Sequence, residues 1–174
     1  MTNYMQLPDA EKLLADLTER IRSDIPPAAA IVGIHTGGAW LAERLHQALG
    51  LTLPLGTLDV SFYRDDFDQI GLHPQVKPSD IPFKVEGSHV ILVDDVLYTG
   101  RTIRAAINEL FDYGRPASVR LATLVDRGGR ELPIVAQYVG MVLELPADKM
   151  LALEQGTMGK LSLSLYDKRG NNGQ

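Results

Sequence analysis

The chain has 174 residues, the length of one ordinary domain, so we expect one core and one main site over residues 1–174. Hydrophobic residues make up 45% and charged residues 22%, which excludes global disorder, and the net charge of -5 excludes whole-molecule attraction to nucleic acid or anionic lipid. Cysteine is absent, which excludes disulfides and thiolate chemistry, and no apolar run approaches the ~18 residues that span a bilayer. We therefore expect a soluble, unprocessed cytoplasmic protein that makes no use of a membrane.

The first third of the chain predicts a helix, a strand and a second helix. Leucine and isoleucine recur at helical spacing over residues 9–21, between acidic and basic residues. A short apolar run over 28–34 is typical of a strand, and a glycine turn at 35–38 leads into a helical pattern that ends near Leu49. Residues 53–63 are mostly apolar and are predicted to be extended.

Residues 64–82 form a polar stretch with several prolines and no clear periodicity. A segment of about twenty residues without structure is unusual inside a compact domain, and lids and binding loops are the common exceptions. We therefore predict a flexible lid here.

The second half alternates strands and a helix. It predicts a strand over 90–93, a helix over 103–111, and strands over 119–125, 138–145 and 160–166, followed by a frayed tail from about residue 168. Alternating strands and helices favour an α/β domain with a mainly parallel central sheet.

Three predicted strands end in polar loops, at residues 35–38, 94–102 and 126–130. In open α/β sheets, ligands bind in the crevice at the carboxyl ends of the strands. Together the three loops would gather carboxylates, glycines, hydroxyls and arginines, which suits a phosphorylated sugar better than an apolar ligand.

The middle loop carries the most information. Asp94 and Asp95 follow a buried apolar run, where carboxylates cost free energy unless they are solvated or paired, so they indicate a metal or ligand. The alternative is a strand end with helix-capping acids. Residues 99–102 then supply backbone amides, two hydroxyls and a helix N-terminus, which together favour an anion such as phosphate.

Other nucleotide and hydrolase motifs are missing from the sequence. It has no G-x-x-x-x-G-K-[ST], no G-x-G-x-x-G after a strand, no G-x-S-x-G and no H-E-x-x-H. The Walker, Rossmann, hydrolase and zinc-protease interpretations are therefore excluded.

Residues 90–102, VILVDDVLYTGRT, resemble the phosphoribosyl pyrophosphate (PRPP) signature of type I phosphoribosyltransferases. The form is that of the PyrR family, pyrimidine operon regulators with uracil phosphoribosyltransferase activity. Further segments resemble the same family in order and spacing, and with the signature they cover roughly residues 9–145: LDVSFYRDD at 58–66, QVKPSDIPF at 75–83, GRPASV at 114–119 and LVDRGGRELPI at 124–134.

The resemblance implies a type I phosphoribosyltransferase fold, with a mainly parallel sheet flanked by helices, a flexible lid loop and a small hood. It implies transfer of the ribosyl phosphate of PRPP to N1 of uracil, giving UMP and pyrophosphate with Mg²⁺ as cofactor. It also leaves an alternative, a regulator that binds RNA and senses UMP or UTP in the same pocket, with weak or vestigial transferase activity. The family further implies a homodimer or higher homo-oligomer.

The resemblance also assigns residues to the site. Asp94 and Asp95 would hold the ribose hydroxyls, directly or through the waters of Mg²⁺, and Arg64 would join them in catalysis by contacting pyrophosphate. The residues implied in PRPP or nucleotide binding are Thr36, Gly37, Asp94, Asp95, Val96, Leu97, Tyr98, Thr99, Gly100, Arg101, Thr102, Asp126 and Arg127. On composition alone, Arg64 could equally belong to a solvated charge cluster, Arg127 to a structural ion pair and Tyr98 to packing.

Gly37 departs from the family pattern, because members commonly carry arginine after the threonine of the first loop. Glycine permits close backbone approach but removes a guanidinium that could neutralise pyrophosphate. We therefore expect low transferase activity, and a gain on Gly37→Arg. RNA binding has no independent support in an acidic chain, and the choice of uracil over other nucleobases depends on the resemblance alone.

Overall fold

The computed structural model describes residues 5–60 and 79–168. Residues 61–78 lie outside the described residues, and with them Arg64 and all of the predicted lid except residues 79–82. Across the described part of the chain, no helix is long and apolar enough to cross a membrane.

A five-stranded, fully parallel sheet forms the centre, with the strands in the order β2-β1-β3-β4-β5. The strands are β1 (Ala30–Ile34), β2 (Gly56–Leu58), β3 (His89–Leu97), β4 (Ser118–Asp126) and β5 (Tyr138–Val142). Every residue of β1 is buried, because helices cover both faces of the sheet and both sets of side chains must be apolar.

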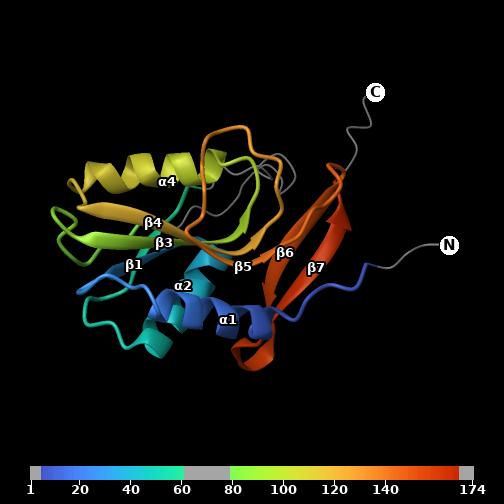
Figure 1. Cartoon of the computed structure of the whole chain (residues 1–174), viewed down its shortest axis with the longest axis horizontal. Coiled ribbons are helices and arrows are strands. Elements are labelled where there is room, and N and C mark those ends of the chain that lie inside the picture. The colour runs from blue at the N-terminus through green and yellow to red at the C-terminus, as the bar shows by residue number, and fades with distance from the viewer. Residues whose placement is uncertain (1–4, 61–78, 169–174) are drawn as a thin grey trace.

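Helices α1 (Ala10–Arg22) and α2 (Gly37–Leu49) cover one face of the sheet, and α4 (Arg101–Asp112) covers the other (Figure 1). Asp9 is the N-cap of helix α1, and its Oδ1 accepts hydrogen bonds from the backbone N–H groups of Glu11 at 2.9 Å and Lys12 at 3.4 Å. The three layers match the predicted α/β class.

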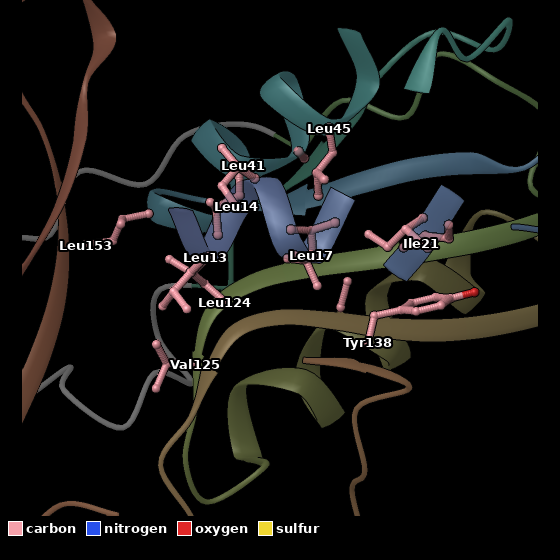
Figure 2. Packing of buried hydrophobic residues seen from close by; sticks show 14 of the residues in the cluster. Leu13, Leu14, Leu17, Ile21, Leu41, Leu45, Leu124, Val125, Tyr138 and Leu153 are labelled. Atoms are coloured by element: carbon pink, nitrogen blue, oxygen red, sulfur yellow. The ribbon is translucent and has the colours of Figure 1, made fainter. Parts of the chain in front are cut away.

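The larger part of the core lies between α1, α2 and the sheet. Leu13, Leu14, Leu17 and Ile21 of α1 point toward the sheet and α2, as Figure 2 shows, and all are buried. Their spacing of three and four residues places them on one helix face, so the predicted amphipathic helix over 9–21 is confirmed with bounds one residue later.

A separate antiparallel hairpin, β6 (Lys149–Gln155) and β7 (Leu161–Asp167), stands at the end of the sheet where α4 begins (Figure 1). We refer to residues 149–167 as the hood. Leu151 and Leu153 of β6 are buried in the same cluster as α1 and α2, so the hood is packed onto the core.

The structure corrects the predicted elements in five places. The extended segment over 53–63 contains only the three residues of β2 among those described, and β6 was not predicted at all. Strand β3 continues to Leu97, so Asp94 and Asp95 lie inside the strand and not beyond its end. The strand predicted over 138–145 ends at Val142, and the one over 160–166 is shifted by one residue.

Candidate active site

The topological switch point of this sheet lies between the carboxyl ends of β1 and β3. These strands are neighbours, and the chain continues from them to opposite sides of the sheet, toward β2 and toward β4. Ligands of open α/β sheets bind at such a switch point. Each strand leads through a short loop into a helix, and neither N-cap residue, Thr36 or Gly100, makes a side-chain capping hydrogen bond. Two positive helix ends therefore border one crevice.

The first loop packs tightly on β3. The peptide between His35 and Thr36 is cis. A Cβ atom added at Gly38 would lie 2.4 Å from the carbonyl oxygen of Val93, so the first turn of α2 rests directly on the backbone of β3. A Cβ atom at Gly37 would lie 2.4 Å from Oδ2 of Asp95. The loop therefore approaches Asp95 so closely that only glycine fits without a shift.

The two carboxylates are buried, with 3% of Asp94 and 7% of Asp95 exposed. Oδ1 of Asp94 accepts a hydrogen bond from the backbone N–H of Asp95 at 2.9 Å, and Oδ1 of Asp95 accepts one from Val96 at 2.8 Å. Side chains alternate along a strand, and Ile91 and Val93 pack with α2. Asp95 faces α2, as its close approach to Gly37 at the start of that helix shows, whereas the alternation is broken by Val96 and Leu97 and does not fix the side of Asp94.

This donor set fits Mg²⁺ that arrives with a phosphorylated ligand. Among the described residues, no group of three or more His, Asp and Glu side chains could hold a metal ion. Mg²⁺ commonly retains several waters and uses one or two carboxylates together with substrate phosphates, in place of a cage made by the protein alone. Asp94 and Asp95 can supply such carboxylates, directly or through water.

The loop between β3 and α4 is held in shape by the rest of the chain. The carbonyl oxygen of Thr99 accepts hydrogen bonds from the backbone N–H groups of Glu131 at 2.9 Å and Leu132 at 3.1 Å, and Oγ1 of Thr99 accepts one from Arg101 at 3.2 Å. Gly100 has φ 93°, in the left-handed region, and a Cβ there would lie 2.9 Å from Ile134. The loop is therefore preformed.

The side chains of this loop differ in what they can offer a ligand. Thr99 and Thr102 are buried beside the N-terminus of α4, whereas the exposed Arg101 pairs with Glu131 at 3.3 Å on the surface. Leu97 is 1% exposed and belongs to the core on the α4 side, and Val96 packs against the other core cluster. The side chains of Val96 and Leu97 therefore serve packing, and only their backbone remains available to a ligand.

The third loop, after β4, is tied to the second. Oδ1 of Asp126 accepts a hydrogen bond from the backbone N–H of Gly128 at 2.9 Å, and Oδ2 pairs with Nη2 of Arg130 at 2.6 Å. Nη1 of Arg130 donates to the carbonyl oxygen of Tyr98 at 2.7 Å. Arg130 was not among the predicted site residues, although it lies in the LVDRGGRELPI segment. It joins the loops after β3 and β4.

Arg127 is the residue after Asp126, at the start of the same loop, but its side chain points into the protein. It is 3% exposed, and its guanidinium donates to the carbonyl oxygens of Lys149 at 2.7 Å and Pro146 at 3.0 Å. Its Cζ lies 3.9 Å from the centre of the Tyr98 ring. This side chain thus contacts both the entrance of the hood and Tyr98.

The comparisons with known proteins agree with this architecture. The model of the phosphoribosyl transferase domain family matches residues 1–150. The structure resembles a hypoxanthine phosphoribosyltransferase from Staphylococcus aureus, with a TM-score of 0.61 and 24% identity over 82% of this chain and 76% of that one. It also resembles a purine phosphoribosyltransferase from Pyrococcus horikoshii, with a TM-score of 0.59 and 28% identity over 78% of this chain and 83% of that one. The chain is therefore built as a type I phosphoribosyltransferase.

Relatives of higher sequence identity show to which family of phosphoribosyltransferase-domain proteins the chain belongs. The chain is 56% identical to the bifunctional protein PyrR of Pseudomonas aeruginosa strain PAO1, over 86% of this chain and 90% of that protein. It is 53% identical to the bifunctional protein PyrR of Pseudomonas fluorescens, over 94% of this chain and 98% of that protein. The chain belongs to the PyrR family of phosphoribosyltransferase-domain proteins, and the resemblance drawn from its motifs is confirmed.

Proposed function

We propose that this protein transfers the ribosyl phosphate of PRPP to N1 of uracil, giving UMP and pyrophosphate. The observation that carries the proposal is the crevice between β1 and β3, where two helix N-termini and two buried carboxylates border one space. Its chemistry suits a sugar that carries anionic groups at both ends, and membership of the PyrR family supports uracil as the acceptor.

In this reaction, the bond from C1 of the ribose to the pyrophosphate oxygen breaks, a bond from C1 to N1 of uracil forms, and N1 loses its proton. Such a displacement passes through an oxocarbenium-like centre, so it depends on positioning and on charge neutralisation. Residues 99–102 bind the 5-phosphate at the N-terminus of α4. Thr36 and the backbone of Gly37 bind the pyrophosphate at the N-terminus of α2.

Asp94 and Asp95 hold the ribose hydroxyls, directly or through waters of Mg²⁺. Bound with PRPP, Mg²⁺ supplies the positive charge that stabilises the leaving pyrophosphate. Arg64 is proposed to add a further cation on the pyrophosphate. Asp126 borders the nucleobase side of the crevice. Beside it, Arg127 lies against the ring of Tyr98 and donates to the backbone carbonyl oxygens of the segment that enters the hood.

A second function, regulation of the pyrimidine operon, is proposed because the PyrR relatives are described as bifunctional. UMP or UTP would occupy the same crevice, and RNA would be the partner. Because the chain has a net charge of -5, the basic surface that would bind RNA has to be assembled from several copies in a homodimer or higher homo-oligomer. We propose that this assembly acts in the cytoplasm.

The test of the transferase is a product assay with PRPP and Mg²⁺, in which uracil, cytosine, hypoxanthine, guanine and adenine are offered in turn. We expect UMP from uracil and no nucleotide from the purines. Nucleotide formation from a purine alone would contradict the uracil assignment, and no product from any base would contradict the transferase itself.

A further inference from the structure

The hood is attached to the site through one buried guanidinium. Nη1 of Arg127 donates to the carbonyl oxygen of Lys149, the first residue of β6, at 2.7 Å, and Nη2 donates to that of Pro146 at 3.0 Å. The planar fork of an arginine can serve two carbonyls at once, which the single ammonium of a lysine cannot do in the same geometry. Arg127 therefore fixes where the hood begins.

The other side of this guanidinium rests on the phosphate loop. Its Cζ lies 3.9 Å from the ring centre of Tyr98, the residue before Thr99. The ring is seated against Gly129, where an added Cβ would lie 2.4 Å from ring atom Cε1 and where φ is 77°. Arg130 holds the Tyr98 carbonyl oxygen at 2.7 Å. Tyr98 is thus fixed at both its backbone and its ring.

These contacts form one continuous path from the phosphate loop to the hood. The backbone N–H of Arg127 donates to the carbonyl oxygen of Leu97 at 3.0 Å, which holds the end of β4 against the end of β3. A buried guanidinium is costly unless hydrogen bonds compensate it, and the two carbonyl oxygens and the Tyr98 ring contribute to that compensation. A shift of the hood would break both carbonyl contacts.

The hood borders the side of the crevice that remains for the nucleobase. In the proposed reaction, the 5-phosphate lies at residues 99–102 and the pyrophosphate at residues 36–37, so the nucleobase faces the loop after β4. The hood enters beside that loop, where the backbone N–H of Leu143 donates to the carbonyl oxygen of Asp126 at 2.9 Å. Figure 1 shows the hood at the end of the sheet where α4 begins.

We propose that Arg127 is a positioning residue, which together with Tyr98 latches the hood in register with the phosphate loop and so sets the nucleobase side of the site. This inference rests on the proposed transferase function and adds the residue pair that holds the acceptor side of its site. The latch acts on nucleobase binding, whereas the PRPP contacts lie on the other side of Tyr98.

The test compares Arg127→Lys with a matched control, Arg44→Gln. Arg44 also donates to a hood carbonyl, that of Gly159 at 3.5 Å, but at the turn far from the crevice, and it pairs with Glu11 at 2.7 Å. KM for uracil, KM for PRPP and kcat are measured for both variants and the unmodified protein, together with hydrogen exchange of the β6 and β7 amides.

We expect Arg127→Lys to raise KM for uracil about tenfold, as the loss of one charge-assisted hydrogen bond allows, and to change KM for PRPP by less than about threefold. In Arg127→Lys, the backbone amides of β6 and β7 should exchange hydrogen faster than in the unmodified protein. Arg44→Gln should leave both KM values unchanged. Tyr98→Leu should resemble Arg127→Lys, and Tyr98→Phe, which retains the ring beside the guanidinium, should lie closer to the unmodified protein than Tyr98→Leu does.

An equal rise in both KM values would overturn the latch, because Arg127 would then act on PRPP itself. Unchanged kinetics with unchanged exchange in Arg127→Lys would overturn it as well. If the unmodified protein forms no UMP, the proposed transferase fails independently, and the exchange data alone decide the latch: faster exchange in Arg127→Lys than in Arg44→Gln supports it, and equal exchange overturns it.

Discussion

Gly37 gives a direct test of how closely the first loop approaches Asp95. In Gly37→Ala, the new Cβ would lie 2.4 Å from Oδ2 and 2.9 Å from Cγ of Asp95, whereas ordinary contacts begin near 3.4 Å. Gly37 is not among the glycines with positive φ, so the perturbation is steric and not conformational. The carboxylate must move by about 1 Å, and overpacking of this kind costs about 1–3 kcal/mol.

Asp95 has little room to accommodate the methyl group. It is 7% exposed, and its Oδ1 accepts the backbone N–H of Val96 at 2.8 Å. PRPP binding needs the carboxylate in its original position, so to the extent that binding has to restore it we expect PRPP affinity to fall, by at most about 150-fold, since each 1.4 kcal/mol corresponds to a tenfold change. Alanine is the better helix former by up to about 1 kcal/mol, which offsets part of the steric cost in the free energy of unfolding.

The assay is calorimetric titration of the protein with PRPP in the presence of Mg²⁺, alongside thermal unfolding without ligand. Gly37→Arg is the informative companion, because it carries the same Cβ and adds the guanidinium that the family pattern leads us to expect at this position. The sequence predicted a gain of activity for this variant. The contact with Asp95 changes that expectation to activity below that of the unmodified protein and above that of Gly37→Ala.

Unchanged PRPP affinity in Gly37→Ala would refute the steric reasoning, because the carboxylate would then have another position open to it. An arginine variant faster than the unmodified protein would restore the expectation drawn from the sequence.

Three further predictions concern the carboxylates, the acid stability and the RNA. Asp94→Asn and Asp95→Asn should each weaken Mg²⁺-dependent PRPP binding about tenfold or more in calorimetry while the protein stays folded, and PRPP affinity unchanged from that of the unmodified protein in both variants would remove these residues from the site. A side-chain hydrogen bond from Arg44 and a backbone one from Leu161 lower the pKa of Glu11 below 4.5, so the stabilisation is present above pH 4.5 and is lost as the pH falls through the lowered pKa. Glu11→Gln should therefore lower the free energy of unfolding at pH 7 by less than about 1 kcal/mol, because the pair is partly exposed, and the difference should vanish in denaturant titrations at acidic pH; a difference that persists there would exclude this ion pair as its source. RNA binding to the leader transcript of the protein's own pyrimidine operon should be weak, dependent on UMP and steeply reduced by salt in filter-binding titrations, whereas tight binding that tolerates salt and needs no nucleotide would contradict a nucleotide-controlled basic face.

The sequence by itself determined the order of the main elements and the chemistry of the central loop. The apolar spacing over residues 9–21 places the buried side of α1 correctly, because helix periodicity is a property of neighbours in the chain. The run over 90–93, followed by two carboxylates and a threonine–glycine turn, likewise predicts a strand that leads into a helix N-terminus. Strand β6 escaped prediction, because its buried face is defined by pairing with β7 and by docking on the core.

Only the tertiary structure decided which side chains meet. Gly37 and Asp95 lie far apart in the sequence, and their contact exists because β1 and β3 are adjacent in the sheet. The two carbonyl partners of Arg127 depend on the docked position of the hood, so no pattern in the sequence could show that its guanidinium holds them. Local patterns specify elements through near neighbours in the chain, whereas these contacts arise between distant segments whose relative positions are set by packing of the whole core.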